Sequence, residues 1–209
     1  MSYTIKPARE VPGSLHFKRV GIIPYFFNHI GEREVSPEVA STGSRDSPSG
    51  SRDSPSPSRH FIMMLDAKYK EWTDCGGSPK QRENWLDTAI RETREESRGF
   101  FRFTRNFVLN NGHIVWREDF RIAVIFVNIT KWMNCLIKAR NLCNKYKLDY
   151  NKGLNDCDDT DRLENCEMEV YGEEELRSLC KEDKIYIPVR RLLQKLFLKK
   201  LHQETLVCV

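Results

Sequence analysis

The sequence predicts a single α/β domain, because strand-like and helix-like patterns of apolar residues both occur along its 209 residues. Runs of apolar, β-branched and aromatic residues at 15–27, 61–65 and 121–129 predict strands. Apolar residues recur at helical spacing in 131–146 and in 188–202, which predicts two amphipathic helices. Hydrophobic residues make up 39% of the chain, enough to build one core.

A further helix is predicted to begin at Asn84, whose short polar side chain favours the position before a helix. A stripe of residues at helical spacing faces the expected core. It consists of Leu86, Ala89, Ile90 and Thr93. On the opposite side Glu92, Glu95 and Glu96 stand at i, i+3 and i+4, so their carboxylates converge. Like charges at this spacing repel by roughly a few tenths of a kcal/mol.

A local rule that is broken without a local gain points to function. Clustered carboxylates suit Mg²⁺ or Mn²⁺, which take oxygen ligands from protein and from substrate phosphates. The alternative is a solvated acidic helix face, and this is the better interpretation for Glu95 and Glu96 taken alone.

Composition excludes several other classes of protein. The net charge of +4 is too small to indicate nucleic-acid binding by itself. No apolar run resembles a signal peptide or reaches the length of a membrane span, so we expect an intracellular, cytoplasmic location without membrane association. The seven cysteines are scattered without a Cys-x-x-Cys pair, which favours reduced thiols over zinc ligands. The oligomeric state is not indicated.

Two insertions are expected within the domain, which we place at 1–205. The first covers about 31–59 and contains Gly-Ser-Arg-Asp-Ser-Pro-Ser twice, at 43–49 and 50–56. Such a polar segment cannot bury enough apolar surface to fold, so we predict disorder, with a tandem duplication favoured over a phosphorylation site at Ser47 or Ser54.

The second insertion covers about 131–165, where the helix of 131–146 leads into an acid-rich stretch that extends to residue 175 and should be mostly a solvated loop.

Between the predicted helix at 85–98 and the strand at 121–129, the sequence predicts a β-hairpin. Phe101 to Leu109 has a strand pattern, and Asn110-Asn111-Gly112 contains the Asn-Gly pair that is a strong hairpin signal. The return strand is expected to include 113–116.

The spacing of Gly77, Glu83 and Arg91-Glu92-Thr93-Arg94-Glu95-Glu96 resembles the Nudix box of the Nudix hydrolases. The glycine, the first glutamate, the arginine and the three helix glutamates all stand at the expected spacing. Thr93 replaces the usual aliphatic residue, and Arg98 stands where the box usually closes with glycine. We expect Gly99, one residue later, to end the helix in the left-handed conformation.

The resemblance implies an α/β/α sandwich with a mixed, curved sheet and a metal-dependent hydrolase. The substrate class would be a nucleoside diphosphate linked to another moiety. Glu92, Glu95 and Glu96, joined by the carbonyl of Gly76, would hold Mg²⁺ or Mn²⁺. The cation would neutralise pyrophosphate oxygens and acidify a bound water.

The resemblance also implies roles for residues around the metal. Arg91 would orient the carboxylates, and Glu83 would support the metal waters or the loop. Glu96 or a later glutamate would accept the proton of the attacking water. The later glutamate would come from a loop before a strand, where Glu164, Glu167 and Glu169 are candidates and Glu167 is our choice.

Substrate contacts are predicted at Gly77 and at Trp72, which would stack on a nucleobase if it is not part of the core. Capped RNA and diphosphoinositol polyphosphates are alternative substrates, because basic residues line the predicted helices at 131–146 and 188–202. A Nudix-fold binding scaffold without turnover is the alternative of another class, and the intact glutamate set argues against it.

Overall fold

The computed structural model describes residues 3–28, 58–119, 121–132 and 165–198, and they form a mixed α/β fold. An open mixed sheet of eight strands runs through its centre. The strands are β1 (Tyr3–Pro7), β2 (Arg19–Asn28), β3 (Ser58–Asp66), β4 (Trp72–Thr73), β5 (Cys75–Gly77), β6 (Gly112–Arg117), β7 (Ile122–Asn128) and β8 (Asn165–Gly172). The predicted α/β class is therefore confirmed.

The long strand β2 organises the sheet. Along one edge it pairs in parallel with β7, and β7 continues antiparallel to β6 and then to β1. Along its other edge β2 has two antiparallel partners: its first half pairs with β5 and its second half with β3. Strand β3 also pairs with β4 and, on its opposite edge, with β8. The sheet therefore divides on one side of β2, with β4 and β5 at the division.

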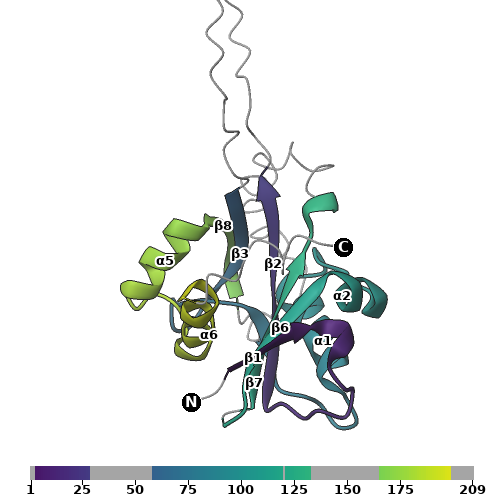
Figure 1. The fold of residues 1–209 in the computed structure, drawn as a ribbon. Coiled ribbons are helices and arrows are strands. Elements are labelled where there is room, and N and C mark those ends of the chain that lie inside the picture. Colours follow the sequence, from purple (N-terminus) through teal and green to yellow (C-terminus); the bar gives the residue numbers. More distant parts are fainter. Residues whose placement is uncertain (1–2, 29–57, 120, 133–164, 199–209) are drawn as a thin grey trace, which may run out of the picture.

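Helices cover both sides of the sheet (Figure 1). Helices α1 (Trp85–Glu96) and α2 (Arg105–Asn111) pack over a core that includes Leu86, Ala89 and Val108. Helices α5 (Glu173–Lys181) and α6 (Ile187–Leu198) pack over a second core that includes Leu176 and Leu192. A short 3-10 helix, η1 (Ala8–Glu10), follows β1.

Most of the predicted elements are present. The strands predicted at 15–27, 61–65, 113–116 and 121–129 correspond to β2, β3, β6 and β7. The C-terminal helix corresponds to α6, which is described as far as Leu198. The Ser/Pro-rich insertion, except for Ser58 and Arg59 at the start of β3, lies outside the described residues, as does most of the predicted helix at 131–146. Strand β1 was not predicted. The loop predicted for the acid-rich stretch is wrong from residue 165 onward, where the chain forms β8 and the start of α5.

The predicted hairpin is wrong. The segment from Arg105 to Asn111 is helix α2, not a strand, and the chain passes from it into β6 without an Asn-Gly turn. The physical reason is the side chain of Thr104, whose hydroxyl accepts a hydrogen bond from the backbone N–H of Phe107 at 3.2 Å and so caps the helix. Asn111 donates its side-chain amide to the Phe107 carbonyl at 2.9 Å, within the last turn.

No helix in the described part of the chain is both long and apolar enough to cross a membrane.

Candidate active site

Strand β5 brings the predicted glycine pair against the last turns of α1. Gly76 lies opposite Gly21 of β2, and the backbones approach so closely that a Cβ at Gly76 would lie 2.5 Å from the Gly21 Cα. A Cβ at Gly77 would overlap the carboxylate of Glu92. The glycine at position 76 therefore allows β2 and β5 to approach closely, and the glycine at position 77 leaves room for Glu92 beside the strand.

Arg91 lies among three of the predicted glutamates. Its Nε and Nη2 donate to the two carboxylate oxygens of Glu83, at 2.7 and 3.0 Å. Its Nη1 lies 2.7 Å from Glu92 and 2.9 Å from Glu95. The hydrogen bonding of Arg91 to Glu83 is the main reason that the pKa of Arg91 is raised. This guanidinium therefore holds the helix carboxylates in place.

Glu83 fastens the loop before α1 to that helix. Besides binding Arg91, its carboxylate accepts from the backbone N–H of Lys80 at 2.9 Å and from the hydroxyl of Thr88 at 3.2 Å. The hydrogen bond from Arg91 is the largest cause that lowers the pKa of Glu83 to about 2. Of the two roles that the resemblance implied for Glu83, the contacts match support of the loop.

Glu96 contacts the strand directly, because its Oε2 accepts a hydrogen bond from the Gly76 N–H at 3.0 Å. The carbonyl of Gly76, the predicted backbone ligand, accepts from Nη2 of Arg19 at 3.1 Å. Arg19 also forms a bidentate pair with Asp74, at 2.6 and 2.9 Å, in which the Asp74 side chain is fully buried. This pair joins the start of β2 to the β4–β5 segment that carries the glycines.

Burial works to lower the pKa of Arg19, but the charge of Asp74 and its hydrogen bonds more than offset this, so the pKa is raised and the guanidinium stays charged. Glu96 contributes to the same rise, which places its charge within electrostatic reach of Arg19. Burial and the nearby carboxylates raise the pKa of the Cys75 thiol, so it stays neutral.

A polar cavity of about 200 Å³ opens where the sheet divides. Glu96, Gly76 and Arg19 form one side of it. The remaining lining residues are Asp66, Tyr69, Glu71, Thr73 and Tyr186. The guanidinium of Arg19 lies over the ring of Tyr186, 5.3 Å from its centroid. Tyr69 is 65% exposed and lies in the turn after β3. The carboxylate of Asp66 stabilises this turn by accepting hydrogen bonds from the backbone N–H groups of Lys68 and Tyr69.

Two predicted site residues lie elsewhere. Trp72 is 9% exposed and packs edge-on against Tyr171 in the core, so the core interpretation of this tryptophan holds and its predicted stacking on a nucleobase is wrong. Glu167 lies within β8, opposite Leu65, and not in a loop before a strand. Its neighbour Glu169 accepts a hydrogen bond from the Tyr171 hydroxyl at 2.8 Å.

The left-handed residue that ends α1 lies one position earlier in the chain than expected. Arg98, at φ +51°, takes the first left-handed position, and its N–H donates to the Glu95 carbonyl at 3.0 Å. Gly99, at φ +76°, donates to the Arg94 carbonyl at 2.7 Å. These two hydrogen bonds form a Schellman cap whose usual glycine position is occupied by Arg98.

Glu92, Glu95 and Glu96 carry carboxylates at one end of the same helix, and carboxylate oxygens are suitable ligands for a hard divalent cation. The side chains are engaged with Arg91 and with the Gly76 N–H, and within the described ranges no three acidic, histidine or cysteine side chains form a ready metal group. Binding a cation would require Glu92 and Glu95 to exchange contacts with Arg91 for contacts with the metal.

Sequence reasoning missed Arg19, Asp74, Tyr69 and Tyr186. Arg19 and Asp74 are separated by 55 positions, so no local spacing connects them. An aspartate between two strand segments, two residues before Gly76, was the signal that could have identified Asp74 as a buried partner of a cation.

A scan against protein-family models gave no match for this chain, and no curated protein matches it either.

Proposed function

We propose that this protein is a Mg²⁺- or Mn²⁺-dependent hydrolase of the Nudix kind that cleaves the pyrophosphate bond of a nucleoside diphosphate linked to another moiety. The observation that carries the proposal is the contact of Glu96 with the Gly76 N–H at the wall of a polar cavity. This contact brings together the glutamates of the segment that resembles the Nudix box, the glycine pair and a cavity whose lining includes cationic and aromatic groups.

Glu92, Glu95 and Glu96 are the residues that would hold the cation. When bound, such a cation neutralises phosphate oxygens and makes a water molecule more acidic. Arg91 positions the carboxylates through its contacts with Glu92 and Glu95, and Glu83 fixes the guanidinium in turn. Glu96 is our choice to accept the proton of the attacking water, because it lines the cavity.

The cavity would hold the group next to the scissile bond. Tyr69 is the aromatic side chain exposed at its rim, so it replaces Trp72 as our candidate for stacking on a base. Arg19 is committed to Asp74 and the Gly76 carbonyl, so we assign it the positioning of β5 and not the binding of phosphate.

The test is hydrolysis of a panel of nucleoside diphosphate derivatives, followed by separation of the products. Wild-type protein should turn over at least one compound with Mg²⁺ or Mn²⁺ and lose that turnover in excess chelator. Glu96→Gln should lower the turnover number by roughly 10²- to 10⁴-fold. Glu174→Gln on α5 is the matched control, because the Glu174 side chain is 90% exposed and lies on another helix.

Turnover that persists in chelator, or equal rates for Glu96→Gln and Glu174→Gln, would refute the proposed site. Binding of panel compounds without any turnover would instead support the scaffold alternative.

A further inference from the structure

A second, larger hollow lies along the solvent-facing side of α1. Its volume is about 800 Å³, and it is bounded by α1 and the segment 98–105. Five arginines line it together with two acids. The arginines are Arg91, Arg94, Arg98, Arg102 and Arg105, and the acids are Asp87 and Glu95. We call this hollow the arginine groove.

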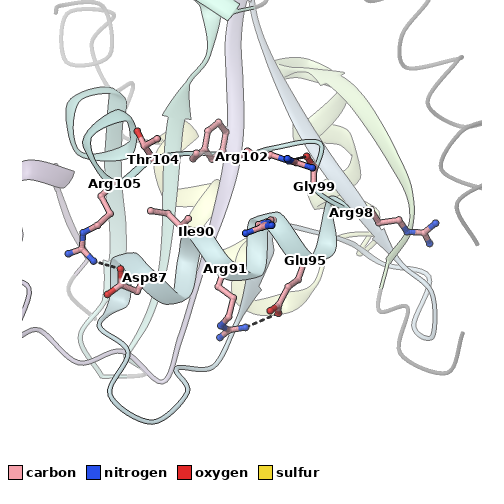
Figure 2. Close-up of a pocket in the computed structure, with 11 residues that line it drawn as sticks. Asp87, Ile90, Arg91, Glu95, Arg98, Gly99, Arg102, Thr104 and Arg105 are labelled. Carbon is pink, nitrogen blue, oxygen red and sulfur yellow. Dashed lines mark hydrogen bonds and ion pairs between the residues drawn. The ribbon is translucent and has the colours of Figure 1, made fainter. Parts of the chain in front are cut away.

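The charges along the arginine groove are unevenly compensated. Arg105 pairs with Asp87 at one end, and Arg91 pairs with Glu95 farther along, as Figure 2 shows. Within the described part of the chain neither Arg94 nor Arg102 forms an ion pair, and the Nε of Arg102 donates to the Gly99 carbonyl at 3.0 Å. The two acids are thus used by two arginines, and the positive charges of Arg94 and Arg102 remain in the groove.

The groove has the dimensions and chemistry of a site for an extended anion. From Asp87 to Arg98 the helix and its cap span about 16 Å, at 1.5 Å per residue. Guanidinium groups match phosphate oxygens because their planar fork can donate two hydrogen bonds at once. Ile90 and Phe103 add apolar surface between the cations. A single small anion would contact only a part of this length.

We propose that the arginine groove binds a linear chain of phosphate groups, with the backbone of a single-stranded nucleic acid as its ligand. Arg94, Arg98 and Arg102 would contact successive phosphates. Binding rests on the groove alone. Only its connection with cleavage rests on the proposed function: the two hollows adjoin at the last turn of α1, where Glu95 lines the groove and Glu96 lines the cavity. A bound chain would therefore lead toward the candidate active site.

The binding test uses the full chain and a short fluorescein-labelled single-stranded oligonucleotide, with anisotropy measured across a salt series in chelator. Chelator removes any metal-dependent hydrolysis, so this result does not depend on the proposed function. The groove variant is Arg94→Ser/Arg98→Gly/Arg102→Ser. Its matched control, Arg9→Ser/Arg121→Gly/Arg191→Ser, removes the same charge from exposed arginines elsewhere. Arg98 and Arg121 both have positive φ, so glycine is tolerated by the backbone at each.

We expect the wild type and the control to bind with a similar salt slope. The groove variant should bind at least tenfold more weakly at low salt, and its slope should be smaller by about 2, since each lost phosphate contact removes about 0.7 from it. The single variant Arg98→Gly, with an unchanged melting temperature, should show about a third of the slope change.

Inorganic polyphosphate as an unlabelled competitor separates the two sources of such a chain. Competition at equal phosphate concentration would mean that the charges of the chain suffice, whereas weaker competition would mean that the bases contribute. No saturable binding by wild type, or an equal loss in the control variant, would overturn the proposal.

Discussion

At the scale of single residues, the guanidinium of Arg91 connects the loop before α1 with the carboxylates at the end of that helix. It is 17% exposed and reaches Glu83, Glu92 and Glu95. Charge-assisted hydrogen bonds in such partly buried sites contribute more than exposed ion pairs, roughly 1.5–3 kcal/mol against 0–1. Its planar fork is what allows one side chain to serve several carboxylates.

Arg91→Lys should therefore be far from conservative. We expect the free energy of unfolding to fall by about 1–2 kcal/mol, because lysine cannot form the bidentate pair with Glu83. Turnover should fall as well, because Glu92 and Glu95 lose their common partner. Arg94→Lys is the control, since Arg94 lies on the same helix but is exposed. Urea denaturation of both variants measures the difference, and equal stabilities would contradict the structural role of Arg91.

Glu83 gives this network a dependence on pH. Because the pKa of Glu83 is lowered to about 2 in the folded protein, its ionised form stabilises the fold above the unfolded pKa of roughly 4.3. This stabilisation is lost as the pH falls through about 2. Glu83→Gln should thus be less stable than wild type at pH 7, and the difference should shrink between pH 4 and pH 2. A difference independent of pH in urea denaturation would contradict the charge-based explanation.

At the scale of secondary-structure elements, sequence prediction succeeded where the interactions are local. The N-cap is an example: Asn84 accepts from the N–H groups of Leu86 and Asp87, both at 3.0 Å, as its type and position predicted. The spacing of Glu92, Glu95 and Glu96 also follows from helix geometry alone.

Prediction failed where a short segment carried two patterns. Phe101 and Phe103 alternate with the polar Arg102, as residues of a strand would. Both phenylalanines are buried in the core, but the segment forms no strand, and Thr104 caps the start of α2 directly after it. The alternation thus reflects core packing, and the strand predicted from it was wrongly continued into the residues of α2. The partners of Arg19 and Gly76 escaped prediction for another reason, because they depend on how β2 and β5 pair.

The contact of β5 with its neighbours yields a prediction that separates folding from activity. Gly76→Ala should strongly destabilise the protein, because the new Cβ would meet the backbone of Gly21 and Val20. At Gly77 the three atoms nearest to a new Cβ all belong to the flexible end of Glu92, so the melting temperature of Gly77→Ala should change little while turnover falls. Thermal unfolding and the hydrolysis assay on both variants provide the test. A stable Gly76→Ala protein would show that the β2–β5 approach is not required.

At the scale of the whole molecule, one sheet supports two separate cores. Leu86, in α1, is 3% exposed and belongs to the core on one face, whereas Leu192, in α6, is 1% exposed and belongs to the core on the other. The strands between them contribute side chains to both, since alternate residues of a strand point to opposite faces. Ile22 and Ile23 of β2, for example, belong to different cores.

This arrangement predicts how two core truncations combine. Leu86→Ala and Leu192→Ala should each lower the free energy of unfolding by about 2–5 kcal/mol, through lost burial and the cavity left behind. Because the two side chains share no core, their effects in the double variant should add within roughly 0.5 kcal/mol. The sheet is common to both cores, so each variant should still unfold in a single transition.

Urea denaturation followed by circular dichroism and by tryptophan fluorescence tests both points. Trp85 lies in one core and Trp72 in the other, so each face carries a fluorophore. Two separate transitions would mean that the two faces of the sheet unfold independently. A departure from additivity above about 1 kcal/mol would mean that the two cores are coupled more strongly than this architecture predicts.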